Sequence, residues 1–346
     1  MMLPKIFLPV LITMCFITPL HAREQIKIVG SSTVYTFAQA VTKSFSEKTG
    51  YPLPDIISTG SGAGLQIFCQ GTGDEHPDIT NASRRIKRSE YDLCLANGVK
   101  NIIELKIGYD GIVVANSTKA QDLKLSIKDL YLALAKEVPD PDGQQLLILN
   151  PYTHWQQINS TLPDEKIEIL GPPPTSGTRD AFSELALEQG CQQYPWIKAI
   201  KKRDKKRFQK ICRTVRNDGY FIEAGERDDL IVKNLEFAPQ ATGIFGYNFL
   251  ARDLDNLQGA TIDGITPEVK TIASGDYPLS RALYLYIKKD RIGEVPGLEK
   301  YLQEFTSETA WGPNGYLADL GLVVMPDKER RDYRQIIEQR KSSDLN

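Results

Sequence analysis

The chain has 346 residues, enough for two domains, and its content of 41% hydrophobic and 25% charged residues is typical of a soluble globular protein. Its formal charge of −2 argues against a dedicated nucleic-acid-binding protein, so we expect no nucleic-acid partner. No apolar stretch after the first two dozen residues reaches membrane-spanning length, so we also expect no stable membrane insertion.

Residues 1–22 have the features of a secretory signal peptide. Lys5 supplies a positive charge, residues 6–20 form an uncharged apolar run, and the small Ala22 ends a cleavage site. Cys15 lies inside this segment, and Met14 before it does not suit a lipoprotein cleavage signal. We therefore expect the protein to be exported, and we leave this segment out of the fold prediction.

Export makes the four remaining cysteines candidates for two disulfide bonds. Three pairings are possible, and we favour the sequence-local one, Cys69–Cys94 with Cys191–Cys212. Loops of about 20 residues would each stabilise the fold by about 3 kcal/mol. Four free buried thiols are the alternative. No Cys or His spacing resembles a metal site, since only His76 and His154 remain after cleavage, and we predict no cofactor.

In chain order, three segments share one pattern, in which an apolar strand is followed by a turn of Gly, Ser and Thr and then by a helix. They cover residues 25–48, 55–69 and 166–188. Further apolar strands are expected at residues 103–107, 111–115, 243–247 and 282–287, and helices at 123–136 and over most of 296–340. Strands that alternate with helices in this way predict an α/β fold with largely parallel sheets.

The third of these turns carries Ser176, Gly177, Thr178 and Arg179 at the start of a predicted helix, directly after three prolines. Ser and Thr are good N-caps, and the acidic Asp180 near the helix start suits the helix dipole. Free N–H groups, two hydroxyls and a guanidinium together favour an anion site. An ordinary capped helix is the alternative interpretation of this stretch.

Two earlier turns repeat this chemistry. The first is Gly30-Ser31-Ser32-Thr33, the second is Thr59-Gly60-Ser61-Gly62, and a strand over residues 77–82 leads to a loop with Ser83 and Arg84. Donors from three turns can converge on one small oxyanion. None of the turns has the Gly-Lys-Ser/Thr ending of a nucleotide-binding P-loop, so a compact free ion is favoured over a nucleotide.

Residues 198–210 are strongly basic. They could contact an anionic surface, but we favour a solvated helix face held by the Cys191–Cys212 bridge.

Five motifs, in order along most of the mature chain, give the sequence a family resemblance. They are Gly30-Ser-Ser-Thr-Val-Tyr35, Gly60-Ser-Gly-Ala-Gly64, Asp78-Ile-Thr-Asn-Ala-Ser-Arg84, Ser176-Gly-Thr178 and Gly243-Ile-Phe-Gly-Tyr247. The chain resembles the PstS-type periplasmic phosphate-binding proteins of phosphate ABC transporters. This resemblance implies a periplasmic, monomeric protein that captures inorganic phosphate and delivers it to the permease subunits of the transporter.

The resemblance also implies a type II periplasmic-binding-protein fold, with two α/β lobes joined by a two-segment hinge. Lobe one would hold residues 23–112 and 280–346. Lobe two would hold residues 113–279, including a basic insertion at about 190–215. The hinge segments would lie near residues 108–113 and 277–283.

By the same resemblance, the phosphate ligands are predicted to be Ser32, Thr33, Val34, Ser61, Ser176, Gly177 and Thr178. The chain's own turns and cations add Ser83, Arg84 and Arg179 as predicted ligands. The chain departs from the family in two places. Arg84 stands where many members have an Asp that accepts the phosphate proton, and Pro172 stands where many have an Arg. Asp110 and Asp180 are the candidate acceptors. Without an obligatory acceptor, sulfate, molybdate or arsenate remain alternative ligands.

Two other classes of function are alternatives. A secreted hydrolase with Ser176 as nucleophile needs a base, and only His76 and His154 are present; Ser176 also lacks the Gly-x-Ser-x-Gly turn. We therefore predict that the protein is not an enzyme. A secreted phosphate sensor or adhesin that uses the basic segment is the second alternative.

Overall fold

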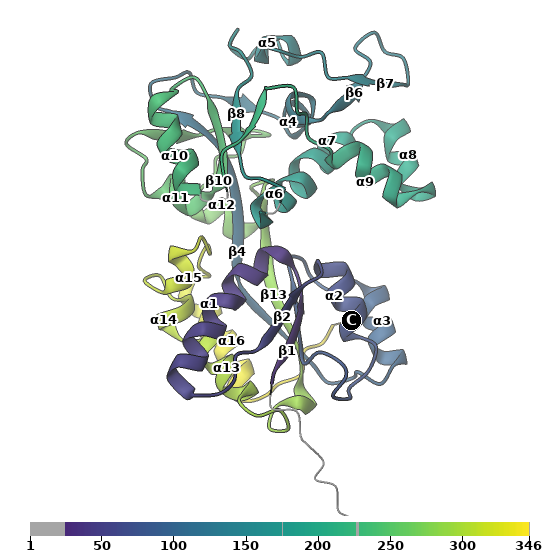
Figure 1. The fold of residues 1–346 in the computed structure, drawn as a ribbon, viewed down its shortest axis with the longest axis vertical. Coiled ribbons are helices and arrows are strands. Elements are labelled where there is room, and N and C mark those ends of the chain that lie inside the picture. The colour runs from purple at the N-terminus through teal and green to yellow at the C-terminus, as the bar shows by residue number, and fades with distance from the viewer. Residues whose placement is uncertain (1–24, 175, 226–227, 346) are drawn as a thin grey trace, which may run out of the picture.

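The computed structural model describes residues 25–174, 176–225 and 228–345, and Figure 1 shows them as two α/β halves, one above the other. Strands from both halves form a single nine-stranded mixed sheet in the order β2-β1-β3-β13-β4-β10-β8-β9, with β11 also paired to β4. The predicted signal peptide, residues 1–22, lies outside the described residues.

One long strand, β4 (Ile102–Ser117), belongs to both halves. Its first part pairs with β13 (Ser280–Lys288), and from Ile112 onward it pairs with β10 (Thr242–Gly246). The sequence predicted two separate strands here. Between the two predicted ranges the strand continues through a β-bulge, because the register with β13 shifts between Leu283 and Tyr284, opposite residues 106–108.

The lower half is built on three parallel strands, in which β1 pairs with both β2 and β3. Its elements are β1 (Lys27–Gly30), α1 (Ser32–Thr49), β2 (Asp55–Ser58), α2 (Ser61–Phe68), β3 (Ile79–Ala82) and α3 (Arg88–Ala96). Helices α1 and α2 begin within three residues of the strands they follow. Because the carboxyl ends of parallel strands meet at one edge of a sheet, both hydroxyl-rich helix starts lie at that edge.

The upper half contains the third hydroxyl-rich turn, between β8 and α6. Its principal elements are α4 (Ile127–Leu134), β8 (Ile169–Gly171), α6 (Gly177–Phe182), a π-helical turn (Ser183–Leu187), α7 (Glu188–Cys191), β9 (Phe221–Glu223), α10 (Asp228–Phe237), α11 (Tyr247–Ala251) and α12 (Val269–Ser274). Strand β8 runs parallel to both β10 and β9. The helix predicted to follow Thr178 is therefore present, with a π-helical turn in its middle.

The remaining elements complete the two halves. They are β5 (Lys124–Leu125), β6 (Glu137–Pro139), β7 (Leu147–Leu149), α5 (Trp155–Ile158), α8 (Pro195–Arg203), α9 (Lys205–Arg213), β11 (Leu257–Gly259), β12 (Thr261–Ile262), a 3-10 turn (Lys289–Arg291), α13 (Leu298–Phe305), α14 (Glu308–Trp311), α15 (Tyr316–Asp319) and α16 (Asp327–Glu338). None of the helices in the described ranges is both long enough and apolar enough to cross a membrane.

The disulfide pairing agrees with the prediction. Cys69 is bonded to Cys94 and Cys191 to Cys212. The first bond joins the region of α2 to α3 in the lower half. The second joins α7 to α9 and so ties the basic segment to the helix that follows Ser176.

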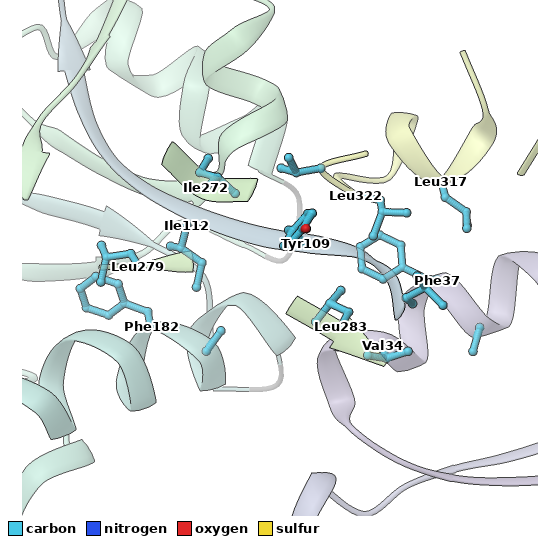
Figure 2. Packing of buried hydrophobic residues seen from close by; sticks show 14 of the residues in the cluster. Val34, Phe37, Tyr109, Ile112, Phe182, Ile272, Leu279, Leu283, Leu317 and Leu322 are labelled. Carbon is cyan, nitrogen blue, oxygen red and sulfur yellow. The ribbon is translucent and has the colours of Figure 1, made fainter. Parts of the chain in front are cut away.

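One hydrophobic cluster runs through the region where the halves meet. Figure 2 shows side chains of both halves gathered around Tyr109 and Ile112 of β4, with Ile272 and Leu279 on one side and Leu283 on the other. The lobe boundaries at 112/113 and 279/280 stay a prediction, which we base on the exchange of strand partners at this part of β4.

Candidate functional site

The N-termini of α1 and α6 face each other directly across the junction of the two halves. The Oγ1 of Thr33 lies 3.5 Å from the carbonyl oxygen of Gly177, and the Oγ of Ser32 donates to Asp180 over 3.1 Å. A Cβ atom at position 177 would lie only 3.1 Å from the Cα of Thr33. Glycine at this position therefore lets the two helix starts approach each other closely.

The turn before α1 is held tightly by the neighbouring strand. Gly30 has a φ of +133°, and a Cβ atom there would lie 2.1 Å from the carbonyl oxygen of Asn81. The backbone N–H of Ser31 donates to the same oxygen over 2.9 Å. The side chain of Ser31 then caps α1 by accepting from Val34 N–H. A residue with a side chain at position 30 would displace the whole hydroxyl-rich turn.

The paired helix starts separate two cavities. The first has a volume of 610 Å³, and we call it the acidic cavity because its charged lining residues are all aspartates. Ser32, Thr33 and residues 176–178 form one wall of it. The aspartates are Asp110, Asp228, Asp229 and Asp319. Asn248 also lines this cavity, and its amide has no hydrogen-bond partner among the described residues.

Two of these carboxyl groups have raised pKa values. Burial raises the pKa of Asp228 to about 6; the Gly246 N–H that it accepts over 2.9 Å opposes the rise, and the charge of Asp110 adds to it. Burial also raises the pKa of Asp110, while the guanidinium of Arg281, 3.3 Å away, opposes that rise. The acidic cavity thus holds two carboxyl groups whose charged forms are disfavoured by burial.

The second cavity, of 390 Å³, lies on the other side of the helix starts, and Ser32 and Thr33 line it too. We call it the basic cavity because Lys and Arg residues outnumber Asp and Glu residues in its lining. The cations are Arg84, Lys87, Lys201, Lys205, Arg213 and Arg281, and the acids are Asp180, Glu184 and Glu188. Residues 59–63, at the start of α2, form its floor together with Ser83.

Arg281 connects the helix starts to the junction of the halves. Its Nη2 donates to Thr33 Oγ1 over 2.6 Å, its Nε contacts Asp110 over 3.3 Å, and its Nη1 lies 3.5 Å from Glu184 Oε2. The side chain is only 9% exposed. Arg281 was not among the residues predicted from the sequence. The available signal was a lone arginine at the start of an apolar strand, inside a predicted hinge segment.

Ser61 and Ser83 form a second polar contact in the basic cavity. The N–H of Ser83 donates to Ser61 Oγ over 3.0 Å, and the two hydroxyl oxygens lie 3.1 Å apart. Arg84, the next residue, makes two hydrogen bonds to the carboxylate of Glu90, of 2.9 and 2.6 Å. It lines the cavity, but with its charge already paired.

Most of the predicted ligands come together in these two cavities. Those that line one or both are Ser32, Thr33, Ser61, Ser83, Arg84, Ser176, Gly177 and Thr178, together with the candidate acceptors Asp110 and Asp180. The side chain of Val34 is buried in the core instead, which leaves only its backbone for a ligand.

Arg179 does not line either cavity. Its guanidinium donates to the carbonyl oxygen of Pro172 over 2.9 Å and lies over the ring of Phe221, 4.3 Å from the centroid. That Arg179 contacts the ligand stays a prediction, and in this structure its guanidinium packs against Phe221 instead of lining the two cavities. An arginine just inside a helix can point to either side, and here an aromatic ring and a free carbonyl attract it away from the cleft.

Comparison with known proteins gives a family and several relatives. Residues 18–309 match the family described as the PBP superfamily domain. The chain is 27% identical over 319 residues to Protein SphX of Synechocystis, covering 90% of this chain and 81% of that protein. It is 28% identical over 310 residues to the Phosphate-binding protein PstS of Staphylococcus haemolyticus, covering 88% of this chain and 82% of that protein.

Solved structures have the same fold. A possible phosphate binding protein of Planctomyces limnophilus aligns with a TM-score of 0.70 at 23% identity, covering 92% of this chain and 99% of that one. An ABC-type phosphate transport receptor of Vibrio cholerae aligns with a TM-score of 0.56 at 18% identity, covering 87% of this chain and all of that one. These alignments support the two-lobed α/β fold.

Proposed function

The chain belongs to the PBP superfamily, and on this premise we propose that it captures inorganic phosphate between its two lobes and delivers it to the permease of an ABC transporter. Relatives that align over most of the chain include several named as the phosphate-binding protein PstS. The nearby structures include a protein described as an ABC-type phosphate transport receptor.

The observation that carries this proposal is the opposite charge of the two cavities on either side of the α1 and α6 N-termini. Monohydrogen phosphate has oxygens that accept hydrogen bonds and one proton that it can donate. Helix N–H groups, hydroxyls and Arg281 can bind its oxygens, while the carboxylates of the acidic cavity can accept its proton. This cleft therefore offers hydrogen-bond donors for the phosphate oxygens and an acceptor for the phosphate proton.

We assign the ligand roles as follows. Ser32 and Thr33 from lobe one and residues 176–178 from lobe two bind the anion beside the point where the two helix starts meet, and Ser61 contacts it from α2. Arg281 is its main charged partner, since it already donates to Thr33 Oγ1. Arg84 has a smaller role, because Glu90 neutralises it. These residues come from both lobes, so a bound anion would hold the cleft closed.

The proton acceptor is the part of the site that determines selectivity. We propose Asp110 for this role, because it lines the acidic cavity and contacts Arg281. Asp180, the other candidate, lies on the other side of the helix starts and accepts a hydrogen bond from Ser32. Asp228 lies near Asp110, whose charge contributes to the raised pKa of Asp228. A buried acceptor rejects an ion without a proton, such as sulfate, because two oxygens would then face each other.

We further propose that the exported protein acts in the periplasm as a monomer and is not an enzyme. The hydrolase alternative required His76 or His154 as a base for Ser176. Neither histidine lines the cavities: His76 lies 3.0 Å from Glu75, and the Nδ1 of His154 lies 2.9 Å from Thr153 Oγ1. A receptor for another tetrahedral oxyanion is the alternative function. The proton acceptor, which we assign to Asp110, distinguishes a phosphate receptor from it.

Isothermal titration calorimetry on the mature protein, stripped of carried-over ligand by unfolding and dialysis, tests the proposal directly. We expect tight binding of phosphate and no heat with sulfate at the same concentration. Equal binding of phosphate and sulfate would replace the proposal by a general oxyanion receptor. Binding of neither ion would reject it and favour the sensor or adhesin alternative.

A further inference from the structure

The basic hairpin, which we define as α8 (Pro195–Arg203) and α9 (Lys205–Arg213), concentrates the positive charge of the molecule. Between residues 198 and 213, nine of the 16 side chains are Lys or Arg and one, Asp204, is acidic, although the whole chain has a formal charge of −2. Seven of the nine cations are exposed: Lys198, Lys202, Arg203, Lys205, Lys206, Arg207 and Lys210. The rest of the chain is therefore acidic on balance.

The hairpin is fixed to lobe two. The Cys191–Cys212 disulfide joins it to α7, and Phe208 and Cys212 are buried beneath it. Glu188 of α7 receives hydrogen bonds from Lys201 over 2.9 Å and from Arg213 over 2.7 Å. Only these two cations take part in this attachment. The seven exposed ones form no ion pair with any of the described residues.

The hairpin also borders the cleft. Lys201, Lys205 and Arg213 line the basic cavity, whose other walls include Ser32 and Ser61 of lobe one. Figure 1 shows α8 and α9 extending from the upper half on the side where α2 and α3 lie in the lower half. The exposed lysines therefore lie on the same hairpin that forms part of the wall of the predicted anion site.

Exposed positive charges beside a cleft affect the association rate of an anion more than the stability of the bound complex. Charges of one sign around a cleft raise the local concentration of the opposite ion and increase association rates by about 10- to 1,000-fold, an effect that salt removes. Exposed lysines contribute little to a contact at equilibrium, because water screens them and their side chains are mobile.

We propose that the basic hairpin collects the anionic ligand and speeds its entry into the cleft, without holding it there. This inference rests on the proposed function, since it takes phosphate as the ligand. It assigns a role to the basic segment that the sequence analysis interpreted as a solvated helix face. The lysines are exposed to water in both interpretations. Only a role in collecting the anion requires that they also lie beside the cleft.

The test compares two variants of equal charge. The first replaces four exposed hairpin lysines that line neither cavity by glutamine: Lys198→Gln, Lys202→Gln, Lys206→Gln and Lys210→Gln. The control replaces four exposed lysines of lobe one that line neither cavity: Lys43→Gln, Lys100→Gln, Lys300→Gln and Lys341→Gln. Dissociation rate constants are measured by exchange of radiolabelled phosphate and Kd values by titration. The ratio of the dissociation rate constant to Kd gives the association rate constant.

We expect the hairpin variant to associate with phosphate about tenfold more slowly than the wild type at low ionic strength, with the difference vanishing near 1 M salt. Its dissociation rate constant should stay within about twofold of the wild-type value, and the control should lose much less association rate. Equal losses in both variants would overturn the proposal, because net charge alone would then explain them. A faster dissociation in the hairpin variant would also overturn it.

A further outcome would assign the hairpin to a different partner. If the association rate is unchanged but the wild type sediments with phosphatidylglycerol vesicles and the hairpin variant does not, the surface docks on an anionic membrane and the proposal is wrong. Failure of the wild type to bind phosphate at all would instead reject the proposed function, so the two failures are distinguishable.

Discussion

The acidic and basic cavities differ in charge although the same two helix starts separate them. The basic cavity is lined by cations whose charges are largely paired, as in Arg84 with Glu90 and Arg213 with Glu188. The acidic cavity is lined by aspartates, and burial raises the pKa of two of them. This difference in lining fits the proposed function, in which cations on one side attract the oxyanion and carboxyl groups on the other side select among oxyanions.

Arg281 links the two cavities, and its removal should have the largest effect. Arg281→Met should weaken phosphate binding by about 3 kcal/mol, because charge-assisted hydrogen bonds each contribute about 1.5–3 kcal/mol. It should also lower the free energy of unfolding by a similar amount, because Asp110 loses its partner. Calorimetry and thermal unfolding measure the two effects.

A second variant separates these two effects. Combining Arg281→Met with Asp110→Asn should restore much of the stability, since no uncompensated carboxylate remains, yet leave phosphate binding weak. Recovery of binding together with stability would show that Arg281 supports the fold and does not bind the anion.

Asp110→Asn tests the acidic cavity. Phosphate binding should weaken by about 2 kcal/mol, the range for a lost hydrogen bond to a charged group, while sulfate binding stays the same or improves. Competition titrations with both ions measure this change in selectivity. Asp319→Asn is the matched control, because that aspartate lines the same cavity but is 76% exposed. A loss of selectivity in the control alone would place the acceptor elsewhere.

Asp228 should make stability depend on pH. Its pKa rises from 3.8 to about 6 on folding, so the native state binds the proton more tightly than the unfolded state does. This contribution is complete below about pH 4 and is lost as the pH rises through 6. Relative to wild type, Asp228→Asn should therefore gain about 2 kcal/mol of stability between pH 4 and pH 7.5, as measured by denaturant titration. A constant difference would mean that folding does not change the pKa of Asp228.

Single hydroxyl groups should contribute less. Ser176→Ala and Ser61→Ala should each weaken phosphate binding by about 1 kcal/mol, since each removes one neutral hydrogen bond to the anion. Titration of both variants compares the lobes, because Ser176 lies in lobe two and Ser61 in lobe one. An effect confined to Ser61→Ala would indicate that the anion binds to lobe one alone.

Arg179→Ala should have the smallest effect on phosphate binding, below about 0.5 kcal/mol, because its guanidinium contacts Pro172 and Phe221 and not the cleft. Thermal unfolding should still register the lost packing. A tenfold loss of affinity without a loss of stability would instead support the prediction that Arg179 faces the ligand.

Local patterns in the sequence were enough to predict the hydroxyl-rich helix starts and the two disulfides. A strand, a short Gly/Ser/Thr turn and a helix are determined by neighbouring residues, as at Ser32 and Ser61. Cysteines about 20 residues apart limit the pairing in the same way. The α/β fold followed from the alternation of these units, and the comparisons support it.

The charged part of the site could not be predicted in this way. Arg281 reaches Thr33 across 248 positions of sequence, and nothing next to either residue indicates the contact. The orientation of Arg84 depends on Glu90, and that of Arg179 depends on Phe221. A long side chain can reach several partners, so its orientation depends on tertiary contacts. Local patterns in a single sequence do not reveal those contacts.

The single strand that runs through both lobes has a consequence for dissecting the protein. A cut at Gly111 would separate the first part of β4 from its partner β13 and leave unpaired backbone groups along an exposed sheet edge. The halves should therefore fold as one cooperative unit, and either half expressed alone should aggregate. Insertions of reporter sequences belong in surface turns, and isolated lobes are unsuitable as starting points for engineered sensors.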